Sequence, residues 1–303
     1  MKIFLTGASG YIGGSVAAAL IASGHTVRGL VRSEARARQV AALGIAPVLG
    51  ALDDATVLAA AARDADAVIN AADSDHRASA EALVEALAGS HKPLLHTSGS
   101  SIVADLAGGE AGSTVYEDDS IVRPNPGRVL RVAVNGLVRA AAGRGVRSVV
   151  ICPTMIYGRG RGAHVDSAQV PKLIALAKKH GVARHVGRGE NIWSNVHLDD
   201  MVDLYLRALE RAPAGAFYYA ENGENSLRQV AQAISRMLGY GGRTAPMTPI
   251  EAAAELGEMP ALYSYGSNSR VRAVRARREL GWAPAGRALI DDIERGSYAA
   301  GGA

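Results

Sequence analysis

The 303-residue chain contains a single cysteine, Cys152, and this scarcity excludes several kinds of site. One thiol forms no intrachain disulfide and supplies no multi-cysteine metal site. The histidines form no cluster with ligand spacing, so no metal site is predicted. Because a chain without disulfides suits a reducing compartment, we expect a cytoplasmic protein.

The chain also lacks a long hydrophobic run, although 48% of its residues are hydrophobic. No stretch approaches the ~20 apolar residues that span a bilayer. The first residues do not combine a basic region, an apolar stretch and a cleavage site in the order of a signal peptide. We therefore expect a large buried core and no membrane partner.

Lysine is scarce as well, since only five of the 33 basic residues are lysine. A net charge of +4 is compatible with nucleic acid or with a smaller anionic ligand. Acidic residues follow the densest basic cluster, which indicates a solvated helix face and no nucleic-acid partner. The cluster comprises Arg270, Arg272, Arg275, Arg277 and Arg278, and the acidic residues are Glu279, Asp291, Asp292 and Glu294.

The first fourteen residues organise the rest of the chain. Residues 1–6 predict a buried strand, a glycine-spaced turn follows, and a helical pattern then runs to Gly24. Glycine permits a tight turn, close approach of the backbone to a pyrophosphate, and close packing of helix on strand. The phosphates would lie on free N–H groups at the helix N-terminus. The segment predicts a dinucleotide site made by Gly7, Ser9, Gly10, Tyr11, Ile12 and Gly13.

A second strand, residues 25–31, is followed at once by Arg32 and Ser33. In dinucleotide folds an acidic residue near the end of this strand binds the adenosine ribose hydroxyls, whereas an arginine accommodates a 2′-phosphate. No carboxylate lies between Thr26 and Ser33, and the planar guanidinium of Arg32 suits a phosphate. We therefore predict NADP (NADPH) in preference to NAD, with Arg32 and Ser33 beside it.

Strands and helices alternate through the first half of the chain. Further strands are expected at residues 45–49, 66–72, 93–97 and 148–152, with helices between them. This alternation predicts a doubly wound parallel sheet, a Rossmann-type α/β fold that binds ligands at the carboxyl ends of its strands. Residues expected at those ends to contact the cofactor are Leu52, Ala71, Ala72, Thr97 and Pro153.

The second half predicts a smaller unit. Residues 104–126 have a loop composition, and Asp199 or Asp200 is expected to cap a helix. Ser226–Gln229 resembles a capping box, and residues 275–282 predict a helix that stops at Gly281. We expect a dinucleotide-binding domain at residues 1–165 and a smaller C-terminal α/β substrate-binding part at 166–303, interleaved as one compact unit.

Six short motifs are spread over nearly the whole chain. They are TGASGYIG at 6–13, NAA at 70–72, HTSGS at 96–100, PTMIYG at 153–158, VHLDD at 196–200 and ELGWAP at 279–284. With these motifs the sequence resembles the short-chain dehydrogenase/reductase superfamily, specifically its extended and atypical members, which include epimerases, dehydratases and ketone reductases. The resemblance implies the Rossmann fold, a nicotinamide cofactor, a small-molecule substrate, and a homodimer formed through helices 79–88 and 127–142.

In that superfamily a serine or threonine after the fifth strand orients the substrate oxygen. A tyrosine exchanges the proton, and a lysine four residues later lowers the tyrosine pKa from about 10 and holds the nicotinamide ribose. No Tyr-x-x-x-Lys occurs in this chain. By the offset from Asn135, Gly127 takes the tyrosine position and Arg131 the lysine position. Arg131 is expected to contact the cofactor without relaying a proton.

Other candidates for proton transfer lie nearby. Gly99 falls where the orienting hydroxyl usually is, which leaves Ser98 and Ser100 on either side. Tyr116 and Tyr157 are candidate substitutes for the missing tyrosine, with a packing role as the alternative for both. Cys152 has no basic neighbour in sequence, so an inert buried thiol is expected.

Three functions follow from these features. The first is an NADP-dependent oxidoreductase that acts on a small carbonyl, imine or sugar-like substrate with a nonstandard proton donor. The second is an NADP-binding redox sensor without hydride chemistry, which the missing Tyr-x-x-x-Lys favours. The third is an epimerase or dehydratase with tightly held NAD, against which the missing acidic residue on the second strand argues.

Overall fold

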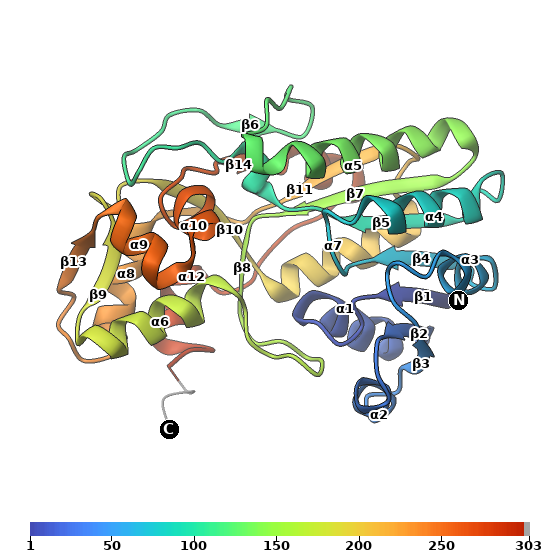
Figure 1. The fold of residues 1–303 in the computed structure, drawn as a ribbon, viewed down its shortest axis with the longest axis horizontal. Helices are drawn as coiled ribbons and strands as arrows, with labels where there is room; N and C mark the ends of the chain where they lie inside the picture. Colours follow the sequence, from blue (N-terminus) through green and yellow to red (C-terminus); the bar gives the residue numbers. More distant parts are fainter. Residues whose placement is uncertain (300–303) are drawn as a thin grey trace.

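The computed structural model describes residues 1–299, and its largest element is a seven-stranded sheet in which all strands are parallel (Figure 1). The chain adds β2 and β3 on one side of β1 and then continues with β4 on the other side. The order of the strands therefore reverses between β1 and β4, where a ligand crevice forms in such folds. This confirms the doubly wound α/β fold. In spatial order the strands are β11 (Ala216–Ala220), β7 (Arg147–Pro153), β5 (Pro93–Thr97), β4 (Ala67–Asn70), β1 (Lys2–Thr6), β2 (Thr26–Val31) and β3 (Ala46–Leu49).

Helices cover both faces of this sheet because successive strand residues point to opposite sides. Phe4 packs with Leu83 on one face, whereas Ile3 and Leu5 pack with Val16 on the other. One face carries α3 (Ala55–Arg63), α4 (Arg77–Leu87) and α5 (Val129–Ala140), and the opposite face carries α1 (Tyr11–Ala22), α2 (Glu34–Ala41), α7 (Leu198–Arg211) and α11 (Val274–Leu280).

A second lobe lies beside the carboxyl ends of the strands, at the left of Figure 1. Its buried residues form a separate apolar cluster. Its helices are α6 (Gln169–His180), α8 (Leu227–Met237), α9 (Pro249–Leu256), α10 (Glu258–Pro260), the π-helix η4 (Ala261–Tyr265) and α12 (Leu289–Arg295). Its strands pair as β12 (Glu224–Ser226) with β10 (Ile192–His197) and β8 (Met155–Tyr157), and as β13 (Thr244–Met247) with β9 (Ala183–Val186).

Several local predictions are confirmed and others are wrong. The Ser226 capping box is present, and α11 ends at Gly281 in the left-handed conformation. The expected cap of α7 is wrong, because the His197 side chain accepts the Asp199 N–H while the two aspartates lie in the first turn. The segment 104–126 is mainly loop and follows the 3₁₀ turn η1 (Ser100–Val103). It includes the strand β6 (Tyr116–Glu117), which pairs with β14 (Val271–Arg272), and the first residue of the 3₁₀ turn η2 (Pro126–Arg128).

The arginine cluster also differs from the expected helix face. Arg272 lies on β14, and both Arg270 and Arg272 bond to Glu224 of β12. Arg275 pairs with Glu279 along α11, as a helical i, i+4 pair. These arginines therefore tie strands and helix together and leave little free positive charge. Among residues 1–299, no helix is both long enough and apolar enough to cross a bilayer.

Asp200 fastens the C-terminal segment to α7. Its buried carboxylate accepts the backbone N–H groups of Ala285, at 2.8 Å, and Gly286, at 2.9 and 3.0 Å. The Trp282 indole N–H donates to the Asp200 carbonyl at 2.9 Å. These bonds account for the VHLDD motif as a structural feature that joins two distant parts of the chain.

A buried polar chain links the carboxyl ends of three central strands. Thr6 donates to Asn70 at 2.6 Å, and the Asn70 amide donates to Nδ1 of His96 at 3.1 Å. Burial, and next the nearby charge of Arg131, lower the pKa of His96 to about 4. His96 is therefore neutral in the folded protein at neutral pH, with its proton on Nε2.

We expect Asp200→Ala to lower the free energy of unfolding by about 1–3 kcal/mol, because two backbone N–H groups of a partly buried segment lose their charged acceptor. Asp199→Ala is the matched control, since Asp199 is half exposed and its carboxylate lies beside exposed Arg161 and, at 3.8 Å, His197. Its effect should stay within ~0.5 kcal/mol. Urea denaturation measures both, and equal losses in the two variants would contradict the role given to Asp200.

The low pKa of His96 makes stability depend on pH. Between about pH 6.5 and about pH 4 the unfolded chain binds a proton that the folded chain does not, so stability falls as pH falls. The loss reaches about 3 kcal/mol across that window. Urea denaturation from pH 4 to 8 should show this slope in the wild type and a flatter one in His96→Gln. Identical slopes would show that His96 does not titrate as described.

Candidate nucleotide and substrate cleft

The turn between β1 and α1 brings three backbone segments into close contact. Gly7 has a φ of +74°, and a Cβ there would lie 2.5 Å from the Ala71 carbonyl oxygen. A Cβ on Gly13 would lie 2.3 Å from the Gly7 carbonyl oxygen. Both glycines are therefore required for the strand, the turn and the helix to approach one another.

The N-terminus of α1 is open to an anion. Gly10 is its N-cap residue, no side chain caps the helix, and the first turn has no acidic residue. Backbone N–H groups and the positive end of the helix dipole therefore remain for a ligand. Ser9 and Gly10 line the cavity beside this end. The donor set fits the pyrophosphate of a dinucleotide.

A cavity of about 600 Å³ continues from this turn past the end of β2. Arg32, Arg36 and Leu52 line it, together with Asp53, whose carboxylate is bound to His76 at 3.0 Å. No carboxylate comes from β2 itself. Ser33, expected beside the cofactor, instead caps α2 by accepting the Arg36 N–H.

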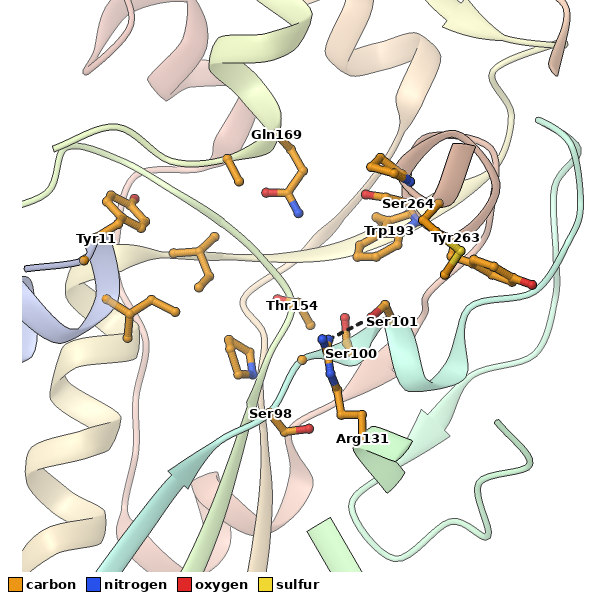
Figure 2. Close-up of a pocket in the computed structure, with 18 of the residues that line it drawn as sticks. Tyr11, Ser98, Ser100, Ser101, Arg131, Thr154, Gln169, Trp193, Tyr263 and Ser264 are labelled. Atoms are coloured by element: carbon orange, nitrogen blue, oxygen red, sulfur yellow. Dashed lines mark hydrogen bonds between the residues drawn. The ribbon is translucent and has the colours of Figure 1, made fainter. Parts of the chain in front are cut away.

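A second cavity of about 570 Å³ extends from the turn toward the second lobe. The two cavities share Gly10, Ala71, Ala72 and His164, so they form one continuous cleft along the carboxyl ends of the strands. Tyr11 and Ile12 lie at its α1 side, and Figure 2 shows Tyr11 across the cleft from the serines and Arg131. Other lining residues include Pro153, Thr154, Ile156, Asp166, Gln169, Lys172, Trp193, Met259, Tyr263, Ser264 and Tyr265.

One wall of this cavity carries the serines that follow β5 (Figure 2). Ser98 accepts a bond from the Asn135 amide at 2.9 Å, and Ser100 accepts one from the Ser269 hydroxyl at 3.0 Å. Both candidate hydroxyls are therefore in the cleft and buried. Thr97 is also buried but does not line the cleft, because its hydroxyl bonds to the buried Tyr205 hydroxyl at 2.6 Å.

Arg131 lies in the same wall and holds two partners. Its guanidinium binds both oxygens of Asp75, at 2.9 and 2.6 Å, in a bidentate ion pair. A third nitrogen donates to the Ser101 hydroxyl at 3.2 Å. Arg128 donates to the same hydroxyl through Nε at 2.8 Å. The expected position of Arg131 at the cleft is therefore found, with a carboxylate that holds its orientation.

Other groups fill the places of the superfamily's missing side chains. A Cβ on Gly99 would lie 3.1 Å from an Arg131 guanidinium nitrogen. A Cβ on Gly127 would lie 2.5 Å from the Met259 methyl and 3.1 Å from the Tyr263 ring. Neither the usual hydroxyl nor the usual tyrosine fits without displacing these groups.

Two candidate tyrosines lie outside the cleft. Tyr157 is buried behind it, where its hydroxyl donates to the Arg287 carbonyl at 2.7 Å, while its β8 neighbour Ile156 lines the cavity. Tyr116 lies on β6, paired with β14, and packs against the main core. Cys152 is fully buried, and burial raises its pKa to about 12 despite a hydrogen bond from Ser98. That thiol is inert at neutral pH.

Sequence reasoning missed the wall residues Ser101 and Arg128, and it missed the role of Asp75 as the carboxylate that holds Arg131. The spacing of Arg128 and Arg131 could have predicted that Arg128 lies at the cleft beside Arg131, because residues three apart lie on one side of a helix. The ion pair between Arg131 and Asp75 could not be predicted from sequence spacing, since it joins residues 56 positions apart.

We expect Gly13→Ala to lower stability by about 2–4 kcal/mol and to abolish nucleotide binding, because its methyl group would overlap the Gly7 carbonyl. Gly136→Ala is the matched control, since Gly136 is also helical and nothing lies within 4 Å of its added Cβ. That change should raise stability by about 0.5–1 kcal/mol. Urea denaturation and NADPH titration measure the pair. Normal binding by Gly13→Ala would contradict the close packing of the turn.

Comparison with known proteins agrees with this geometry. The model of the NAD dependent epimerase/dehydratase family matches residues 3–218. The oxidase ucsJ of Acremonium sp is 32% identical over 345 residues, which cover 97% of this chain and 95% of the oxidase. A 4-hydroxy-2-methyl-3-oxo-4-farnesyl-3,4-dihydroquinoline-1-oxide ketoreductase of Stigmatella aurantiaca is 32% identical over 317 residues, which cover 93% and 92% of the two chains.

Solved structures share the fold at lower identity. The dTDP-glucose 4,6-dehydratase of Bacillus anthracis, solved in complex with NAD, has a TM-score of 0.78 at 15% identity, over 99% of this chain and 96% of that one. The family match covers most of the chain and includes the glycine turn, both arginines of the cleft wall, five of the seven strands of the large sheet in full, most of β1 and part of β11. The chain belongs to the NAD dependent epimerase/dehydratase family.

Proposed function

We propose that the protein is an NADP-dependent oxidoreductase that transfers a hydride to or from a small carbonyl, imine or sugar-like substrate. The observation that supports this most is the continuity of the cleft. One end is an uncapped helix N-terminus behind a glycine turn, and the other is a wall of hydroxyl and guanidinium groups. A dinucleotide and a small substrate would meet between them.

The preference for NADP rests on the residues around the part of the cleft that would hold the adenosine half of the cofactor. Arg32 and Arg36 line the cavity there, and β2 supplies no carboxylate to accept ribose hydroxyls. Within residues 1–299, Arg32 forms no ion pair or side-chain hydrogen bond, so its donors remain available. Two carboxylates from other segments also line this cavity, Asp53, which is bound to His76, and Asp73. Two arginines at this end, with no acid at the end of β2 where the ribose hydroxyls would be bound, favour a 2′-phosphate.

Each part of the chain would have a distinct task. The N–H groups after Gly7 would hold the pyrophosphate, and Pro153 and Ile12 would enclose the nicotinamide end. Bound there, the nicotinamide supplies or accepts the hydride. Trp193 and Tyr265 line the cavity and give it an aromatic surface. Gln169, on the side of the cavity toward the second lobe, adds a polar amide (Figure 2). These side chains would orient the substrate.

Relatives support redox chemistry, because two of them are named an oxidase and a ketoreductase. A second candidate is an epimerase or dehydratase that keeps NAD bound, which the family's name favours. NAD released on denaturation of the purified protein would support that candidate. A redox sensor is the third, and turnover of any substrate with NADPH would exclude it as the sole function.

We expect Arg32→Ala to weaken NADPH binding about 10- to 100-fold, because a charge-assisted contact of about 1.5–3 kcal/mol is lost. NADH binding should change little. Arg38→Ala is the matched control, since Arg38 is exposed on α2 and does not line the cavity. Fluorescence titration with both nucleotides measures the effects. Equal loss of NADH and NADPH binding, or tighter NADH binding by the wild type, would contradict the preference for NADP.

A further inference from the structure

Ser101 is bonded unlike any other hydroxyl in the cleft wall. A serine oxygen has two lone pairs and one proton. Both lone pairs of Ser101 are used, one by Nε of Arg128 at 2.8 Å and one by a terminal nitrogen of Arg131 at 3.2 Å. The hydroxyl is buried, yet it lines the cavity. Its only remaining capacity is to donate its proton.

The two guanidinium groups also favour negative charge at this oxygen. Asp75 neutralises Arg131, but no ion pair within residues 1–299 neutralises Arg128. Burial, and next the charge of Arg131, lower the pKa of Arg128, so the cation is under electrostatic stress there. A negative charge that develops beside the pair relieves that stress.

We propose that Ser101, held by Arg128 and Arg131, is the catalytic hydroxyl that donates to the substrate oxygen in place of the missing tyrosine. This assignment rests on the proposed oxidoreductase function and adds the group that handles the proton. Arg131 takes the lysine position of the superfamily pattern, but it acts on a serine from η1 rather than on a tyrosine four residues earlier. Asp75 is a positioning residue, because it reaches the reacting atoms only through Arg131.

The proton and electron balance of such a step is complete. Reduction adds a hydride, with its electron pair, from the reduced nicotinamide to the carbonyl carbon, and the carbonyl π pair moves to oxygen. Ser101 gives its proton to that oxygen. The resulting serine alkoxide, bonded to two guanidinium groups, takes a proton from water that enters the open cleft, and the hydroxide formed leaves to bulk solvent, which supplies the one proton that the reduction consumes. The same path in reverse serves oxidation of an alcohol.

The neighbouring hydroxyls are less suited. Ser98 is bonded to Asn135 and to the Cys152 thiol, and Ser100 to Ser269, without a direct cationic donor. The Tyr263 ring lines the cavity but extends away from Ser98 and Arg131 (Figure 2). Among the described residues of this wall, only Ser101 accepts bonds from two guanidinium groups and keeps its own proton available to donate.

The first test compares Ser101→Ala with Ser98→Ala and Tyr263→Phe. NADPH oxidation is followed with a panel that includes ethyl acetoacetate and 2,3-butanedione. We expect Ser101→Ala to lower kcat about 10²- to 10³-fold, the usual loss for one oxyanion donor, with the Kd for NADPH unchanged. Ser101→Thr, which keeps the hydroxyl, should recover part of that loss. A larger fall in kcat with Ser98→Ala or Tyr263→Phe would overturn the assignment.

The second test does not depend on turnover. Binding of 2,2,2-trifluoroethanol to the complex with NADP is measured by fluorine NMR, because its acidic hydroxyl resembles the product alcohol. Affinity should fall at least tenfold in Ser101→Ala and stay within twofold in Ser120→Ala, a serine outside the cleft that accepts the Glu117 N–H. Equal affinity in the wild type and Ser101→Ala would overturn the proposal. Lack of turnover by the wild type, with Ser101-dependent binding intact, would instead count against the oxidoreductase function alone.

Discussion

The contact between the glycine turn and the end of β4 is the constraint on which the rest of the cleft depends. Gly7 and Gly13 leave no space for a Cβ, so β1, α1 and the Ala71 segment lie as close as backbone allows. This packing directs the uncapped N-terminus of α1 along the carboxyl ends of the strands. Ala71 and Ala72 then line both cavities and join them.

The opposite wall is held by electrostatics rather than by close packing. Asp75, from the loop after β4, binds Arg131 of α5, and Arg131 reaches the serine turn that follows β5. One guanidinium therefore links the loop after β4, the helix α5 and the turn after β5. The places of the missing hydroxyl and tyrosine are filled by Arg131 beside Gly99 and by Met259 and Tyr263 beside Gly127. The reaction centre is rearranged around these groups and is not simply incomplete.

Sequence alone predicted what local patterns encode. Hydrophobic strands and glycine spacing located six of the seven strands of the parallel sheet and the phosphate turn within a few residues, but the edge strand β11 was not predicted. Arg131 was placed correctly at the cleft because one offset along a helix decides its position. Tyr157 was a weaker candidate that strand alternation could have excluded, since its neighbour Ile156 lines the cavity and adjacent residues of a strand face opposite sides.

The remaining features depend on contacts between distant segments. Ser101 gains its role from guanidinium groups 27 and 30 positions away, and nothing in the serine-rich turn itself distinguishes it from Ser98 or Ser100. The cap of α7 by His197 was missed because two aspartates stand at the more usual capping positions. The pairing of Arg270 and Arg272 with Glu224 likewise requires β12 and β14 to lie together.

The central claim is that this cleft transfers hydride between an NADP cofactor and an external substrate. The most direct measurement supplies NADPH deuterated at C4, on each face in turn, with a panel of carbonyl compounds, and locates deuterium in the products by mass spectrometry. Hydride transfer predicts one deuterium on the new carbinol carbon from one face only. Sugar-nucleotide isomerisation or dehydration with the label retained on tightly bound cofactor, and no labelled alcohol, would contradict it.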